Sequence, residues 1–454
     1  MTVAPCGGQR RGRGILTGEM VGLLRIRDFR LLFVGEGVSL LGDQFYFIAL
    51  PWLVLELSHD PFTLGAMLAL QGLPRALFML VGGAVTDRFS PRRVMIGSNV
   101  ARCVLAALLA ALVLSGSVRL WMLWSIVFAF GVADGFFFPA QSAIVPRLAA
   151  TEQLPAANAV VQGLDQVAQF VGPMLAGALI AGFTAGRLGL QGVGLALAVD
   201  AATFVVSVAT LWVMHVDRVS AAQEGGSVRE GFAYMWGDGL LRTLLALIVA
   251  VNFLAVGPLL VGIPQLVRER LGEGAGAFGV VMSAFGAGSL AGLALGGTLP
   301  KPPPRVTGNL LLAVCAVFGA GLAILGFAHT LVGALLPALL MGLAVGYLMV
   351  SFFSWIQTRT PQRMMGRMMS LIIFASVGLV PLSQLVSGAV ARRSVTALFV
   401  GAAILLGLVV VRAWFVPSLR AMGVEIAAGN DGDLALAEAA GPAGGASSDG
   451  RDAP

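Results

Sequence analysis

The chain has 454 residues, of which 57% are hydrophobic and 11% are charged, and its formal net charge is +6. Soluble globular proteins carry about 25% charged residues, so this composition excludes a soluble protein and indicates an integral membrane protein. The positive charge comes almost entirely from arginine, and in a membrane protein such an excess is typical of cytoplasmic loops rather than of a nucleic-acid-binding surface.

Twelve apolar runs follow one another along the chain, each bounded by charge, proline or glycine. Each is near or above the roughly 20 residues that a helix needs to cross a bilayer. The runs cover residues 29–57, 62–84, 94–115, 119–140, 158–182, 191–214, 240–263, 276–299, 308–328, 331–353, 366–390 and 394–416. We therefore predict an all-α integral membrane protein with twelve transmembrane helices in two six-helix, pseudo-symmetric halves.

The polar stretches between the runs predict the domain organisation. Residues 1–28 form an N-terminal tail, 29–214 the first half, 215–239 a central loop, 240–416 the second half and 417–454 a tail that we expect to be disordered. The first run begins too late and is too long for a cleaved signal peptide. If both termini are cytoplasmic, far more arginines fall in inside segments than in outside ones, so we predict that orientation.

Metal and catalytic signatures are missing from the sequence. The three cysteines and three histidines lie singly, without metal-ligand or disulfide spacing. No phosphate-binding loop of an ATP-driven pump occurs. We therefore expect no metal site, no cofactor and no enzymatic activity.

The turn between the second and third runs is short and densely charged. It contains Gly83, Asp87, Arg88, Arg92 and Arg93. Because both flanking runs are about as long as one bilayer crossing, these charges are expected where two membrane helices meet water.

The fifth run carries a glycine pattern, in which Gly163 is followed after eight residues by Gly172 and Pro173, and then by Gly177. Small residues let membrane helices approach closely, and proline removes a backbone hydrogen bond and loosens the helix. The spacing predicts a bendable, closely packed helix. An ordinary glycine-rich packing face is the alternative.

Both patterns resemble signatures of the major facilitator superfamily of transporters. The charged turn matches that family's loop between helices 2 and 3, with Ser90 at the place of a glycine, and the fifth run resembles the helix 5 signature of its exporters, with Ala176 at the place of another. Stretches around the first and fourth runs look like the bacterial branch with the enterobactin exporter and macrolide efflux proteins. The resemblance implies antiport. We interpret Asp87 and its arginines as a gating latch between helices that biases the outward-facing state, and not as a substrate site.

Several charged side chains are predicted at membrane depth, where each costs at least about 2.5–3.5 kcal/mol unless it meets a partner or a cavity. Glu36 and Asp43 are seven residues apart and share one face of the first helix, and Arg75 lies at a depth between them on the second. Burial favours a protonated carboxyl, whereas a guanidinium favours the charged form. This trio is our candidate for proton coupling. The alternative is that the arginine only neutralises the acids and holds the helices together.

Three further charges, Arg102, Asp134 and Asp165, are predicted toward the inner mouth, and we interpret them as a structural or gating network. Asp200 is expected somewhat toward the outside of the sixth helix, as a cap on that side, and we assign it no role in transport. The apolar cores of helices 7 to 11 carry no charge.

The substrate cavity is predicted to have an aromatic, sparsely polar wall, which would suit an amphipathic or lipophilic molecule. Our candidates for its lining are Tyr46, Asn252 and Gln384.

The sequence thus predicts a secondary transporter, and specifically a proton-coupled exporter of small amphipathic molecules such as drugs, siderophores or secondary metabolites. An uptake symporter and a non-transporting receptor or scaffold are the alternatives. The expected partners are a small-molecule substrate, protons and the lipid bilayer, but no nucleic acid, and the chain is expected to be a monomer. We expect it in the inner membrane of a bacterium, with many passes and both termini cytoplasmic.

Overall fold

The computed structural model describes residues 22–150, 153–183, 190–215, 236–237, 239–299, 304–359, 368, 372 and 375–420. The predicted tails and the predicted central loop fall mostly outside these ranges. Every element within them is a helix, and eleven helices are long and apolar enough to cross a membrane. The remaining predicted run, 366–390, overlaps in its later part with the shorter apolar helix Ala375–Ala391. The prediction of an all-α membrane protein is confirmed.

The helices follow the predicted runs closely. The first half consists of α2 (Arg27–Ser58), α3 (Pro61–Arg88), α4 (Pro91–Leu114), α5 (Leu120–Ile144), η1 (Val145–Arg147), α6 (Leu154–Gly182) and α7 (Gln191–Val213). The second half consists of α9 (Gly239–Gly257), η3 (Pro258–Gly262), α10 (Ile263–Glu269), α11 (Ala275–Thr298), α12 (Pro304–Gly326), α13 (Leu331–Arg359), α15 (Val380–Ala391), α16 (Val395–Trp414) and α17 (Pro417–Arg420).

Local chemistry determines where the helices begin and end. At the junction of α2 and α3, His59 adopts a left-handed conformation with φ of 52° and ends α2. Asp60 caps α3 by accepting a hydrogen bond from the Phe62 N–H, and Pro61 occupies the first helical position, where its missing N–H does no harm. The chain therefore reverses within two residues.

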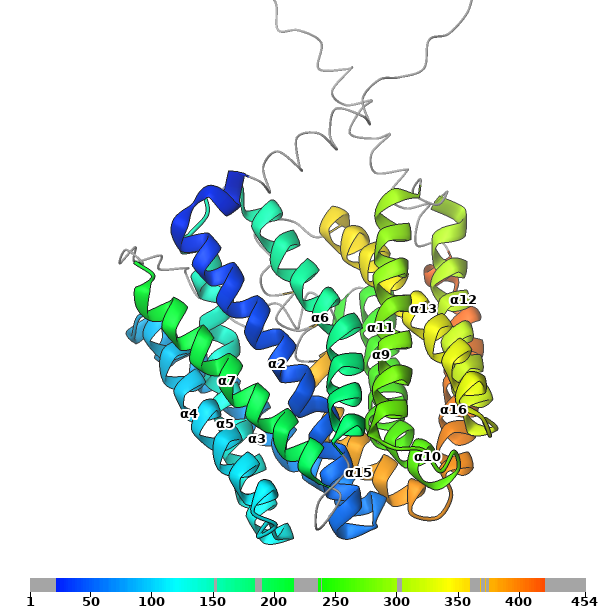
Figure 1. Ribbon diagram of the computed structural model, residues 1–454. Coiled ribbons are helices and arrows are strands. Elements are labelled where there is room, and N and C mark those ends of the chain that lie inside the picture. Colours follow the sequence, from blue (N-terminus) through cyan, green and yellow to red (C-terminus); the bar gives the residue numbers. More distant parts are fainter. Residues whose placement is uncertain are drawn as a thin grey trace, which may run out of the picture.

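The two halves lie side by side and converge at one end of the bundle (Figure 1). Within the first half α7 packs on α2 and α4, and α3 packs on α5. Within the second half α11 packs on α13, and α12 packs on α16. The main contacts between the halves join α3 to α15 and α6 to α11.

Glycines bring the backbones together at both of these crossings. A Cβ atom at Gly65 of α3 would lie 2.3 Å from the carbonyl oxygen of Gln384 in α15, and one at Gly279 of α11 would lie 2.2 Å from that of Pro173 in α6. Helices in lipid associate through van der Waals packing rather than through a hydrophobic driving force. Such close approach is therefore what holds the halves against each other.

The seventh predicted run is interrupted. After α9 the chain forms η3, a π-helical segment that begins at Pro258, and continues as α10. Ser383 of α15 supports the break, because its hydroxyl donates to the Phe253 carbonyl (2.5 Å) and accepts from the Gly257 N–H (3.0 Å). Neighbouring side chains commonly satisfy backbone groups that proline frees in membrane helices.

The packing predicts a matched pair of glycine substitutions in α11. A Cβ at Gly288 would lie 1.9 Å from the Leu339 carbonyl oxygen of α13, whereas one at Gly297 would meet no atom within 4 Å. We expect Gly288→Ala to lower the midpoint of thermal unfolding of the purified protein, because overpacking typically costs about 1–3 kcal/mol. Gly297→Ala should leave the midpoint unchanged or raise it. Equal midpoints for the two variants would contradict the described packing.

Candidate functional site

A cavity of about 390 Å³ lies between the two halves. Helices α2 to α5 supply one wall, and α9, η3, α11 and α15 contribute to the other. The charged side chains all come from the first half, whereas the second half contributes apolar groups and one amide. The charged and amide residues of the lining are Asp43, Gln71, Arg75, Arg102, Asp134 and Gln384.

Arg102 of α4 is the centre of the charged wall. Its side chain is 3% exposed, and its Nη1 lies 3.3 Å from Oδ1 of Asp134 and 3.7 Å from Oδ1 of Asp43. The two carboxylates come from α5 and α2, so one guanidinium joins three helices. Asp43 is 35% exposed, and Asp134 is 9% exposed. Asp43 is therefore the carboxylate that a proton or a substrate in the cavity can reach.

Other side chains hold the guanidinium in place. Nη2 of Arg102 donates to Asn99 Oδ1, and Asn99 in turn donates to the Ser207 hydroxyl of α7 at 2.9 Å. The rings of Phe137 and Phe204 lie 4.0 Å and 4.6 Å from the guanidinium carbon, measured to their centroids. Cation–π contacts strengthen when the cation is removed from water. Arg102 is thus fixed by charge, by hydrogen bonding and by two aromatic faces.

The residues of the predicted proton-coupling trio lie in different surroundings. Arg75 lines the cavity with Asp43, but its guanidinium stacks on Phe138 at 4.1 Å, and the arginine within ion-pair distance of Asp43 is Arg102. Glu36 is buried, and one of its oxygens accepts a hydrogen bond from Gln141 at 2.9 Å. Its other oxygen has no partner within the described part of the chain.

The predicted gating network is only partly brought together. Arg102 and Asp134 form the ion pair described above, whereas Asp165 accepts a hydrogen bond from Gln169 of its own helix at 2.7 Å.

The predicted cavity residues divide between two spaces. Tyr46, which stacks on Phe130, and Gln384 both line the central cavity. Asn252 lines a second, mainly apolar cavity of about 240 Å³ in the second half, and its amide donates to its own helix at the Ile248 carbonyl. Val256 belongs to both linings, so the two spaces adjoin.

The charged turn lies at the end of α3 and the start of α4. Arg92 donates to the carbonyls of Leu211 and Trp212 at 2.6 and 2.5 Å, so it caps the C-terminal end of α7, where a cation is favoured. Gly83 has open space around it, and Arg88 and Arg93 are exposed. The side chain of Asp87 lies outside the described part of the structure.

The glycine pattern of the fifth run lies in α6. Gly172 faces Gln44 of α2, and a Cβ at Gly177 would lie 3.0 Å from the Ala275 carbonyl oxygen at the start of α11. Pro173 lies at the same crossing, whereas a Cβ at Gly163 would meet no atom within 4 Å. The later part of the pattern, from Gly172 to Gly177, thus lies where α6 packs on its neighbours.

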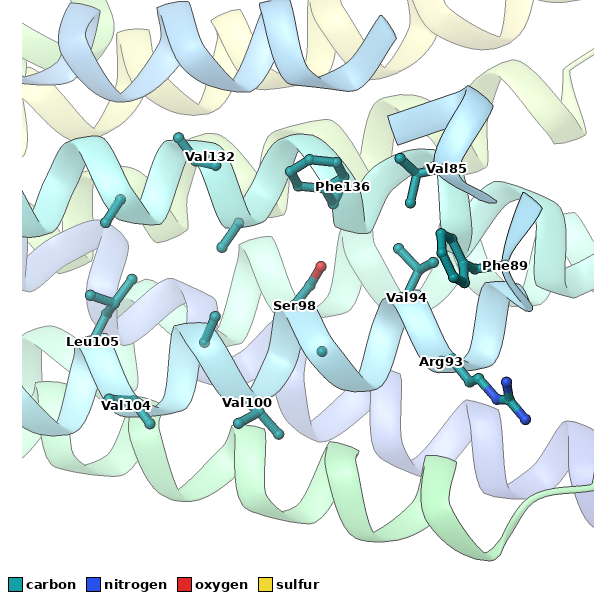
Figure 2. A pocket seen from close by; sticks show the side chains of 14 residues that line it. Val85, Phe89, Arg93, Val94, Ser98, Val100, Val104, Leu105, Val132 and Phe136 are labelled. Carbon is teal, nitrogen blue, oxygen red and sulfur yellow. The ribbon is translucent and has the colours of Figure 1, made fainter. Parts of the chain in front are cut away.

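A third hollow lies on the side of the first half, between α4 and α5 (Figure 2). It measures about 820 Å³, and its lining is apolar apart from Ser98 and Arg93, both of which Figure 2 labels. Exposed Val100 and Val104 border it. Because it lacks a buried charge, this groove suits contact with lipid rather than the chemistry of coupling.

The end of the bundle where α2 ends and α3 begins, which we call the closed face, carries polar links between the halves. Arg268 of α10 lies 3.4 Å from the Glu56 carboxylate, and its Nη2 lies 2.8 Å from Nδ1 of His59. Arg392, just after α15, lies 3.4 Å from the Asp60 carboxylate. His59, Asp60, Arg268 and Arg392 also line a polar cavity of about 590 Å³.

Sequence reasoning did not find this closed face, nor the link between Asp43 and Arg102. The sequence held one usable signal for the Arg102 cluster, because Asn99 and Arg102 are three residues apart and so share one face of a helix. Within the described residues no group of three or more His, Cys, Asp or Glu side chains is placed to hold a metal ion.

The chain is similar to known membrane transporters in both sequence and fold. Residues 32–380 match the family model described as Major Facilitator Superfamily. The multidrug efflux pump Tap of Mycolicibacterium fortuitum is 25% identical over 84% of this chain and 93% of its own length. The enterobactin exporter EntS of Salmonella typhimurium is 23% identical over 76% of this chain and 80% of its own. A solved structure of a mutant of the nucleoside transporter NupG covers 85% of this chain and 99% of its own, with a TM-score of 0.66 at 12% identity.

The ion pairs of the closed face predict how easily that face opens. We expect Glu56→Gln and Arg268→Gln each to weaken it by the amount that an exposed pair contributes, about 0.2–1 kcal/mol. A cysteine introduced by Leu68→Cys in the cavity lining, in a background without the native cysteines, reports the opening. Its labelling by a membrane-impermeant maleimide added at the closed face should accelerate in both variants.

The double variant should label no faster than the faster single variant, because both substitutions remove the same pair. Arg393→Gln, on the same loop as Arg392, serves as the control for lost charge. Labelling rates that do not change in either single variant would contradict a role of the Glu56–Arg268 pair in keeping this face closed.

Proposed function

Because the chain belongs to the major facilitator superfamily, we propose that it is a proton-coupled exporter of small amphipathic molecules that works by alternating access. We place it in the inner membrane of a bacterium, with both termini cytoplasmic, as the distribution of arginines suggests. The observation that carries the proposal is Asp43, which is open to the central cavity and at the same time paired with the buried Arg102.

Proton and substrate compete for Asp43 in this proposal. The ionised carboxylate is attracted to Arg102 across 3.7 Å, a loose pair, while Asp134 keeps the shorter contact of 3.3 Å. A proton removes the charge of Asp43 and leaves Arg102 to Asp134. A cationic or hydrogen-bond-donating group of a substrate needs the ionised form instead. Binding of one therefore excludes the other, which is what exchange across a membrane requires.

Glu36 and Arg75 belong to the proposal as neighbours of this site. Glu36 lies seven residues before Asp43 on α2 and has one unpartnered oxygen among the described residues. Arg75 adds a second positive charge to the cavity wall. Both influence how readily Asp43 holds a proton.

The two walls of the central cavity differ in polarity, and this difference suggests the chemical character of the substrate. The first half offers charge, and the second offers apolar side chains and the adjoining apolar cavity around Asn252. A molecule with one polar end and an apolar body can use both surfaces.

The direction of transport is supported by the relatives whose names describe efflux and export. Uptake by symport is the alternative. Susceptibility of a deletion strain to a panel of lipophilic drugs and secreted metabolites identifies a compound, and its flux in proteoliposomes under an imposed pH gradient then gives the direction. Movement of the compound against the proton flow supports export, and movement with it supports symport. A receptor or scaffold would show no flux.

Asp43→Asn should abolish gradient-driven transport, because asparagine cannot alternate between a charged and a protonated state. Accumulation of the compound should fall to the level of vesicles without protein, while insertion into the membrane stays normal. Asp28→Asn, at the start of the same helix and outside the cavity, is the matched control. Undiminished gradient-driven transport by Asp43→Asn would overturn the assignment.

Asp87→Asn tests the proposed latch in the charged turn, which we infer biases the outward-facing state. Removing this charge should change the rate of transport or the balance of conformations, and should leave the relative rates for different compounds unchanged. Initial rates for two chemically distinct substrates measure both effects. A variant that is altered only in its substrate preference would rule out the latch.

A further inference from the structure

Asp200 of α7 is a buried carboxyl group for which the transport scheme has so far given no role. Its side chain is fully buried, and neither carboxyl oxygen has a hydrogen-bond partner among the described residues. Its surroundings are tightly closed, since a Cβ at Gly42 of α2 would clash with the Thr203 hydroxyl of α7, within one turn of Asp200. The Thr203 hydroxyl donates to the backbone carbonyl of Asp200, at 2.7 Å, and not to its carboxyl.

An ionised carboxylate in this position would be very unfavourable. A buried carboxylate is costly unless it is both paired and hydrogen-bonded. Burial without a hydrogen-bond partner among the described residues therefore favours the protonated, neutral form of Asp200 in this conformation.

The neighbours of Asp200 are those of the proposed coupling site. The segment of α7 that carries Asp200 packs on that site, because the Ala201 carbonyl accepts a hydrogen bond from Cys103 of α4 at 3.4 Å and the Phe204 ring centroid lies 4.6 Å from the Arg102 guanidinium carbon. The charged and titratable groups of this region are Asp43 and Tyr46 of α2, Arg102 and Cys103 of α4, and Asp134 of α5. From α6, which also packs on α7, Asp165 is engaged by Gln169.

Two of these neighbours also have unused hydrogen-bonding capacity. The Nε of Arg102 and the hydroxyl of Tyr46 are both buried without a partner in the described structure. Arg102 thus has one N–H group free while its Nη atoms contact Asp43, Asp134 and Asn99. Each of these two donors can donate a hydrogen bond to a carboxyl oxygen such as those of Asp200. Leaving a buried donor or acceptor without a hydrogen bond is costly.

We propose that Asp200 is a second proton-binding site, which exchanges its proton with Asp43 while Arg102 changes its carboxylate partner. The inference rests on the proposed role of Asp43 in coupling. In the conformation that exchanges the proton, the Tyr46 hydroxyl, which has no partner in the described one, accepts the proton of the Asp200 carboxyl and gives its own proton to the Asp43 carboxylate. Arg102 then pairs with the newly ionised Asp200 through its free Nε–H. The charge of the cluster stays constant, and Asp43 is neutralised without a proton from the cavity.

The first experiment needs no transport substrate. Infrared spectroscopy of the purified protein in lipid detects the C=O stretch of protonated carboxyls at neutral pH. Asp200→Asn should remove one such band, whereas Asp134→Asn should retain it, because Asp134 is paired with Arg102 as a carboxylate. A spectrum of Asp200→Asn that keeps every protonated-carboxyl band of the wild type would overturn the proposal.

The second experiment separates a relay from a merely structural role. Asp200→Asn should lose gradient-driven accumulation and retain substrate exchange at equal pH, and Tyr46→Phe should slow the gradient-driven rate without removing the infrared band. Normal coupling in Asp200→Asn would overturn the relay. If neither the wild type nor the variant moves any compound, the proposed function fails, and the infrared result still decides the protonation of Asp200.

The thermal stability of two Asp200 variants tests whether this carboxyl is unpaired. Removing a neutral carboxyl that makes no hydrogen bond takes away no interaction, and replacing an unsatisfied buried group by an apolar one can be neutral or stabilising. Asp200→Asn and Asp200→Val should both fold, with thermal midpoints close to that of the wild type. Failure of both to fold would contradict an unpaired, protonated Asp200.

Discussion

A buried guanidinium has to be neutralised and hydrogen-bonded, and the arrangement of the first half follows from that requirement at Arg102. Its carboxylate partners come from α2 and α5, its amide partner from α4 itself, and its aromatic neighbours from α5 and α7. The contacts of Arg102 thereby connect four helices of the first half, namely α2, α4, α5 and α7. Truncating one member of a buried ion pair typically costs about 3–5 kcal/mol because the other charge is left uncompensated. The cluster therefore constrains how these helices can move relative to each other.

The second half is built on a different principle. Its core is apolar, and its helices approach through glycines, as where Gly288 and Gly292 of α11 meet the α13 backbone. Its π-helical segment, η3, is supported by the Ser383 hydroxyl rather than by charge. The central cavity thus has one wall that can change its charge and one that cannot. For the proposed exporter, the first half provides coupling, and the second provides a passive apolar surface for the cargo.

The sequence predicted the helices well, because hydropathy and length alone distinguish a membrane-spanning run from its loops. It also assigned each buried charge an expected depth by counting residues along a helix, but Asp200, which was expected toward the outside, lies on the segment of α7 that packs against Arg102. It could not predict which charges meet, because the rotation of each helix and the identity of its neighbours depend on packing between segments far apart in the chain. Asp43 was therefore grouped with Arg75, which lies at a suitable depth, whereas the structure brings it to Arg102. For the same reason Asp165, at a similar depth to Asp134, lies apart from the cluster, and Asp200 lies beside it.

The contacts between the halves differ in strength from the cluster within the first half, and this difference bears on alternating access. The pairs of Arg268 and Arg392 at the closed face are exposed to solvent, and exposed pairs contribute about 0–1 kcal/mol each. At the crossings of α3 with α15 and of α6 with α11, glycines bring the backbones of the two halves into close approach without any ion pair between the described residues of these helices. Leaving a buried charge without its partner costs about 3–5 kcal/mol, which is several times the contribution of a surface pair. For the proposed alternating-access mechanism, we therefore expect the pairing of Arg102 with its carboxylates to bias the two conformations more strongly than the polar links at the closed face do.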